Sequence, residues 1–259
     1  MTTRTPADEL ELTLTPPLAV VTLSRAPRLN ALSPTLIEAL IAAAQRLAAD
    51  PSCQVVVLRG EGRAFCAGFD LDALATAAAP TVAEADLGRR LIDAWSTLPQ
   101  PVIAAVHGAC IGGGLLLAAA CDLRVAASGT HFSIPELELG LPLAWGGVPR
   151  LVRLLGPTVA AQLVFDATGF DAEQALAWRL VNRVVDASAL DAQAIAWASR
   201  IAQRPGIVLR AAKRRLSGAV EALSPTLGDT SDAADLIAAC ADPQARAAMQ
   251  RYVADRRRR

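Results

Sequence analysis

Near its middle the chain reads Val102-Ile-Ala-Ala-Val-His-Gly-Ala-Cys-Ile-Gly-Gly-Gly-Leu115, an apolar run that passes into closely spaced glycines. Its first five residues are all apolar, which is typical of a strand buried on both faces. The glycine triplet Gly112–Gly114 marks a turn at which another backbone or a ligand approaches closely before a helix begins. Buried strands that alternate with helices predict an α/β protein with a covered sheet.

This segment belongs to a longer stretch, Ala94–Cys121, that contains no Asp, Glu, Lys or Arg. A membrane-spanning helix needs about 20 apolar residues, so the stretch is long enough to raise that possibility. Pro99, Pro101 and the glycine triplet divide it, however. We therefore expect a buried strand, a turn and a buried helix in place of a membrane span.

The charges of the chain balance, with 25 Lys and Arg residues against 25 Asp and Glu residues. This balance argues against a nucleic-acid-binding protein and against a polybasic membrane-surface protein, so neither nucleic acid nor a membrane is an expected partner. The first ten residues lack the apolar segment of a secretory signal, and the five cysteines form no metal-binding spacing. We expect reduced thiols, a cytoplasmic location and no metal.

Working outward, apolar and β-branched runs predict strands at Leu10–Leu14, Leu18–Leu23 and Val55–Arg59. Ser33 and Pro34 predict the N-cap and first residue of a helix that ends near residue 49. Helices are predicted later in the chain at Ala189–Arg204, Ile207–Ser217, Ala219–Leu223 and Asp242–Arg256. We expect an α/β core over residues 1–200 and a helical region over residues 201–259.

The late helices are rich in alanine and apolar on more than one face. A helix that is apolar around most of its circumference is buried on several sides, and self-association is one way to bury it. The pattern therefore favours a homo-oligomer, and a tightly packed monomeric core is the alternative.

Two glycine loops follow predicted strands. The first loop, Gly60–Asp70, follows the strand Val55–Arg59, and the second loop, His107–Leu115, follows the strand Val102–Val106. The second loop places free N–H groups at the positive end of a helix dipole, which suits an anion. Neither loop has the glycine spacing of a dinucleotide-binding fingerprint or the lysine of a phosphate-binding P-loop. An oxyanion that forms during a reaction is therefore the better candidate.

The segments Ala64-Phe-Cys-Ala-Gly-Phe-Asp-Leu71 and Val106–Gly114 resemble the enoyl-CoA hydratase/isomerase (crotonase) family. Five further segments match this family: Ser24–Leu32, Cys121–Arg124, Ile134–Gly140, Gly146–Leu151 and Leu180–Val185. The resemblance implies an α/β fold with a crotonase-like spiral of strand–strand–helix (ββα) turns and a C-terminal helical oligomerisation region. It also implies a homotrimer or a hexamer.

The resemblance implies an acyl-CoA thioester as substrate, with coenzyme A as part of that substrate and no separate cofactor. Carried over by position, the backbone N–H groups of Phe69 and Gly113 hold the thioester oxygen. Arg28 is expected near the phosphates of coenzyme A and the backbone of Ala67 near its adenine. The other expected substrate-binding residues are Asp70, Leu71, Gly114, Leu116 and Pro135.

Hydratases of this family use two glutamates, and this chain keeps one of them. Glu136 matches the second, in the Pro-Glu motif, whereas Leu116 stands at the position of the first. A single glutamate suits a Δ3-to-Δ2 enoyl-CoA isomerase, which takes a proton from C2 and returns it to C4. The alternatives are a hydratase of reduced efficiency and a non-catalytic acyl-CoA-binding protein. The sequence leaves open the roles of Glu138 and Trp145.

Overall fold

The computed structural model describes residues 2–4, 9–72, 80–227 and 231–258, and its centre is a seven-stranded sheet. The strands of this sheet, in spatial order, are β1 (Thr2–Arg4), β2 (Leu10–Thr15), β3 (Leu18–Leu23), β4 (Val55–Gly60), β5 (Val102–Val106), β7 (Leu123–Ala127) and β10 (Arg183–Val185). The strands from β3 onward run parallel. A smaller sheet contains β6 (Ala109–Ile111), β8 (His131–Ser133) and β9 (Phe170–Asp171).

The chain repeats a strand–strand–helix unit that gives one strand to each sheet. In the first unit, β5 and β6 are followed by α4 (Gly113–Ala120); in the next, β7 and β8 are followed by α5 (Gly147–Leu155). Strands β5 and β7 pair in parallel in the large sheet, and β6 and β8 pair in parallel in the small one. These units are the spiral of ββα turns expected from the sequence.

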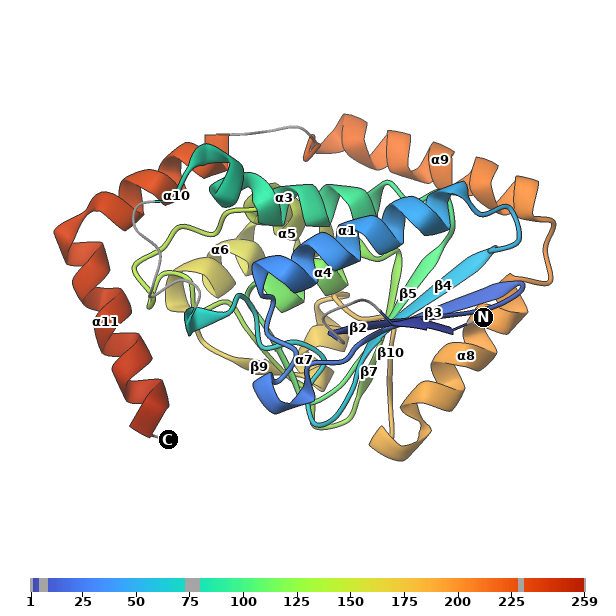
Figure 1. Cartoon of the computed structure of the whole chain (residues 1–259), viewed down its shortest axis with the longest axis horizontal. Coiled ribbons are helices and arrows are strands. Elements are labelled where there is room, and N and C mark those ends of the chain that lie inside the picture. The colour runs from blue at the N-terminus through green and yellow to red at the C-terminus, as the bar shows by residue number, and fades with distance from the viewer. Residues whose placement is uncertain (1, 5–8, 73–79, 228–230, 259) are drawn as a thin grey trace.

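Helices cover both faces of the large sheet (Figure 1). The helices α1 (Pro34–Ala49), α3 (Val82–Ser96) and α4 pack on one face around the fully buried Trp95, and α8 (Leu190–Ile201) packs on the other. The Ser33 hydroxyl accepts a hydrogen bond from the Leu36 N–H at 3.1 Å, which confirms the predicted cap of α1. The remaining short elements are η1 (Ala26–Arg28), α6 (Pro157–Asp166), α7 (Ala172–Ala177) and η2 (Ala187–Ala189).

Three helices follow the core, namely α9 (Gly206–Leu223), α10 (Ser231–Ala241) and α11 (Pro243–Arg258). The break that the sequence predicted between residues 217 and 219 is wrong, because α9 continues through Gly218. One exposed glycine costs a helix only about 1 kcal/mol, which the rest of an 18-residue helix offsets. The sequence also missed α10, which packs on α3. No helix in the described ranges is long and apolar enough to cross a bilayer.

Lys213 ties α9 to the start of β5. Its side chain is buried, and its Nζ donates to the Gln100 carbonyl and to Asp122 Oδ2, each at 2.7 Å. The same Asp122 oxygen accepts the N–H of Val102 at 2.7 Å. One carboxylate therefore joins the C-terminal helices to the strand that leads into the glycine triplet.

Replacing Lys213 by Met removes this junction, leaves the Gln100 carbonyl without the Lys213 donor and leaves the Asp122 carboxylate without its cation. We expect the free energy of unfolding to fall by about 2–3 kcal/mol, the range for hydrogen bonds to charged groups. Urea unfolding measures the change. Arg215→Met, at an exposed position of the same helix, is the matched control and is expected to have little effect. Equal stabilities of the two variants would contradict the assignment.

Candidate active site

Two backbone N–H groups have no acceptor among the described residues where the first helix turn of α4 meets the loop at residue 68. The N–H of Gly112 donates to the Ser133 carbonyl at 2.9 Å, whereas the next N–H, that of Gly113, has no acceptor among the described residues. In the facing loop, the Gly68 carbonyl and the Asp70 N–H both pair with Leu32, at 2.7 and 3.1 Å. The N–H of Phe69 between them is left unpaired within the described chain.

The two segments that carry these donors are in direct contact. A Cβ added at Gly68 would lie 2.9 Å from the Ile111 carbonyl oxygen and 3.7 Å from the Gly113 nitrogen. Cys66 joins the two segments, because its N–H donates to the Ala109 carbonyl and its carbonyl accepts from the Ile111 N–H, both at 3.0 Å. The donors predicted for the thioester oxygen are thus brought together at a helix N-terminus, where the dipole favours negative charge.

Glu136 lies against the same helix start. A Cβ added at Gly112 would lie only 2.5 Å from Glu136 Oε1, so the carboxyl group occupies the space that the missing side chain leaves. Its Oε2 is buried and has no hydrogen-bond partner among the described residues. Burial raises the pKa of Glu136 to about 7, and its own backbone N–H offsets a small part of that effect. Glu138 is exposed, so the structure separates two acids that the sequence could not.

Apolar side chains, including Leu116, line the cavity that Glu136 also lines. Leu116, one turn into α4, is 2% exposed, and its methyl groups pack against Gly147 together with Leu143. Four other carboxylates line the cavity. Asp70 and Asp72 pair with arginines, Glu84 closes the capping box of α3, and Glu38 is exposed on α1. Among the described carboxylates that line the cavity, Glu136 is therefore the one pressed against the start of α4.

The cavity in front of these groups has a volume of about 1230 Å³. The expected substrate-binding residues that line it are Arg28, Ala67, Asp70, Leu71, Leu116 and Pro135. Gly114 is the exception, because it lies against Cys66, whose carbonyl oxygen would be 2.5 Å from an added Cβ. Asp70 is 6% exposed and accepts from Arg25 Nη1 at 2.6 Å, so it orders the loop more than it presents a free carboxylate.

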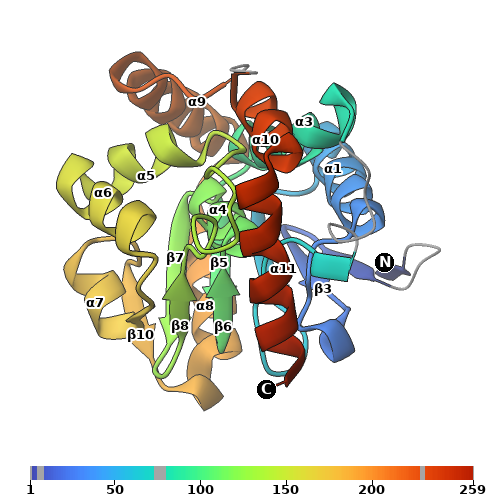
Figure 2. The same ribbon diagram turned by 90° about the vertical axis from the view of Figure 1, so that its left-hand side faces the viewer.

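The sequence missed the contribution of the last two helices. Leu236 and Cys240 on α10 and Met249 and Tyr252 on α11 line the same cavity. Figure 2 shows α11 running alongside β6 and α4 in that view. The signal available in the sequence was the alanine content of these two segments, which does not say what they cover.

Comparisons with known proteins agree with this geometry. A family model described as Enoyl-CoA hydratase/isomerase matches residues 15–258. A Mycobacterium tuberculosis protein named "Probable enoyl-CoA hydratase" is 37% identical over 208 residues, 79% of this chain and 78% of the relative. A crotonyl-CoA hydratase of Syntrophomonas wolfei is 34% identical over 198 residues, 76% of each. A crystal structure of a Bacillus anthracis enoyl-CoA hydratase is 30% identical, has a TM-score of 0.80, and covers 94% of this chain and 91% of that one.

The buried carboxyl group makes a stability prediction with a definite sign. Burial opposes the ionisation of Glu136, so its pKa is about 7 in the folded protein against an ordinary pKa of 4.5. The contribution of this group to the free energy of unfolding therefore falls as the pH rises from 4.5 to about 7. Glu136→Gln removes this loss. Relative to wild type, the variant is therefore expected to be more stable at pH 8 than at pH 4 by about 3 kcal/mol.

Urea unfolding at the two pH values measures this difference. Glu138→Gln, at an exposed carboxylate two residues away, is the control and is expected to show no comparable gain. A Glu136→Gln variant whose stability follows the wild type across this pH range would show that the carboxyl group is not buried as described.

Proposed function

Because the chain belongs to the enoyl-CoA hydratase/isomerase family, we propose that it moves the double bond of a 3-enoyl-CoA thioester to the 2 position. The observation that carries this proposal is the Glu136 carboxyl group, whose Oε2 is buried, beside two backbone donors that have no acceptor among the described residues. Isomerisation needs one group that takes a proton and gives it back, and this site offers one such group. Fatty acyl-CoA metabolism is the corresponding setting.

In the proposed reaction, the thioester oxygen accepts hydrogen bonds from the N–H groups of Phe69 and Gly113. The ionised Glu136 removes a proton from C2, and the electron pair of that C–H bond moves into the carbonyl to give a dienolate. The carboxylic acid then returns the proton to C4, so that the C2–C3 double bond and the carbonyl form together. Each donor to such an oxyanion contributes about 2.7–4 kcal/mol to the transition state.

The raised pKa of Glu136, about 7, suits both halves of this cycle. A base of this strength is partly ionised near neutral pH and accepts a proton more readily than an ordinary carboxylate. Since the ionised form starts the cycle, kcat/KM is expected to rise with pH through about 7.

Hydration is the second candidate, and the names of the hydratase relatives favour it. Adding water needs a group that holds and deprotonates the water and a group that protonates C2. The buried side chain of Leu116 supplies neither function. If the chain hydrates enoyl-CoA, we therefore expect it to do so at reduced efficiency.

A non-catalytic acyl-CoA-binding protein is the third candidate, and Leu116 motivates it as well. Glu136 weighs against it, because a buried carboxylate with an unpaired oxygen reduces stability and gives a passive binder no advantage. Catalysis explains why the group is kept in this environment.

We also propose that the chain assembles as a homotrimer or a hexamer. Helix α9 exposes Ile207, Leu216 and Leu223 to 80%, 67% and 84%, and a second copy of the chain would cover such residues. A cytoplasmic location remains our proposal and is supported by five cysteines that are all free thiols.

The proposed function is tested by replacing Glu136 with Gln, which keeps the shape and removes the proton carrier. Conversion of hex-3-enoyl-CoA to hex-2-enoyl-CoA, followed by chromatography, is expected to slow by about 10²- to 10⁴-fold. Glu138→Gln is the matched control and is expected to turn over at close to the wild-type rate. Full activity of Glu136→Gln, or no turnover by the wild type, would overturn the proposal.

The assembly is tested by light scattering of the wild type and of a variant that carries both Leu216→Glu and Leu223→Glu. The wild type is expected at three or six times the chain mass of 27.0 kDa, and the variant at a lower multiple, because burying the added carboxylates is unfavourable. Gln45→Glu, exposed on α1, adds charge away from α9 and serves as control. A monomeric wild type would contradict the proposal.

A further inference from the structure

Trp145 lies beside the two backbone donors in an unusual conformation. Its φ of +65° is in the left-handed region that non-glycine residues rarely adopt. Its ring meets the Phe69 ring edge-on, with 5.9 Å between centroids and an interplanar angle of 83°. A Cβ added at Gly113 would lie 2.5 Å from Trp145 Cζ3. The indole therefore contacts both residues whose N–H groups hold the thioester oxygen in the proposed reaction.

Gly88 on α3 provides the niche for the other edge of the indole. A Cβ added there would lie 1.8 Å from Cε2, 2.1 Å from Cδ2 and 2.3 Å from Nε1 of Trp145, and these are its three nearest atoms. Any larger residue at this position would displace the ring. The three nearest atoms all belong to Trp145, so Gly88 and the indole are packed directly against each other.

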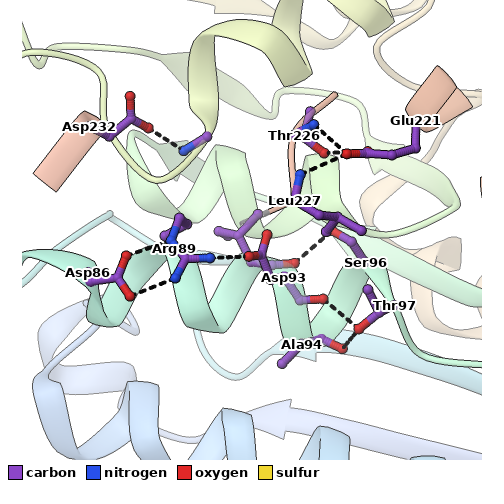
Figure 3. A network of polar contacts seen from close by, with 12 residues as sticks. Asp86, Arg89, Asp93, Ala94, Ser96, Thr97, Glu221, Thr226, Leu227 and Asp232 are labelled. Carbon is purple, nitrogen blue, oxygen red and sulfur yellow. Dashed lines mark hydrogen bonds and ion pairs between the residues drawn. The ribbon is translucent and has the colours of Figure 1, made fainter. Parts of the chain in front are cut away.

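The backbone around Trp145 is fixed from a third direction. The N–H of Gly146 donates to Asp232 Oδ2 at 2.6 Å, and Asp232 lies in the first turn of α10 (Figure 3). The N–H of Gly147 donates to the Ala144 carbonyl at 3.0 Å. Helix α10 in turn packs on α3, the helix that carries Gly88. The indole therefore lies between Gly88 of α3 and Gly113 of α4, and α10 anchors the backbone beside it.

Leu116, Leu143 and Ala144 line the cavity together with Trp145. Leu143 and Ala144 are 5% and 8% exposed, and Leu116 packs against Gly147. An acyl group whose carbonyl is held by Phe69 and Gly113 meets the indole close to the reacting carbons. Such a wall sets an upper limit on the length of chain that fits in the pocket.

We propose that Trp145 is the specificity-determining residue of this site and closes the acyl pocket beside the oxyanion donors, so that the enzyme takes short acyl-CoA thioesters. The inference rests on the proposed function for the identity of the substrate. It goes beyond that function in naming the acyl class and the residue that selects it.

The test is a double-mutant cycle of Trp145→Ala and Gly88→Ala, read out by calorimetric binding of saturated butanoyl-, hexanoyl-, octanoyl- and dodecanoyl-CoA. The wild type is expected to prefer the short chains. For Trp145→Ala, the ratio of the affinity for long chains to the affinity for short chains is expected to rise by at least about 10-fold. One methylene in an apolar pocket changes the discrimination between two substrates by about 10- to 200-fold. Trp145→Phe is expected to give an intermediate profile.

Gly88→Ala, made in two backgrounds, distinguishes the contact between Gly88 and Trp145 from general effects on the fold. In the wild-type background the added methyl displaces the indole, and we expect binding of every chain length to weaken by about 10-fold or more. In the Trp145→Ala background the methyl meets no indole, so the same substitution is expected to have little effect. This non-additivity is the signature of a direct steric contact.

An unchanged length profile in Trp145→Ala, or an equal effect of Gly88→Ala in both backgrounds, would overturn the inference. Because binding is measured with saturated thioesters, these outcomes do not depend on turnover. A wild type that binds short acyl-CoA thioesters but does not isomerise 3-enoyl-CoA would overturn the proposed function and leave the role of Trp145 supported.

Discussion

The absence of three consecutive Cβ atoms at Gly112–Gly114 is the constraint on which the site depends. Each glycine receives a different neighbour at the start of α4: Glu136 Oε1, Trp145 Cζ3 and the Cys66 carbonyl oxygen would each lie 2.5 Å from an added Cβ. A carboxyl group, an aromatic wall and the loop that contains Cys66 therefore converge on one helix terminus. Any side chain in the triplet would separate elements that the proposed chemistry needs in contact.

The same convergence determines the electrostatics. The helix start offers unpaired N–H groups that favour negative charge, while the packing that brings Glu136 there removes it from water and raises its pKa to about 7. Stability and chemistry oppose each other at this carboxyl group. Its ionised form is unfavourable in the folded state, and that penalty makes it a stronger base than an ordinary glutamate.

Local patterns in the sequence predicted the features that depend on neighbouring residues. The strand Val102–Val106, the cap formed by Ser33 and the glycine turn were all predicted, because each follows from the residues next to it. The choice of Glu136 over Glu138 needs the turn geometry, and the position of Trp145 needs Gly88, which lies on another helix. Contacts between residues far apart in the chain leave no periodic signal, so the sequence could not place them.

The central claim is that one buried carboxyl group carries a proton from C2 to C4. The most direct measurement is nuclear magnetic resonance of the products formed from hex-3-enoyl-CoA in deuterated water. The account predicts hex-2-enoyl-CoA as the main product, with former C2 hydrogen present at C4 in part of the molecules, because Glu136 is shielded from solvent. 3-Hydroxyhexanoyl-CoA as the main product, or C4 that receives only deuterium, would contradict it.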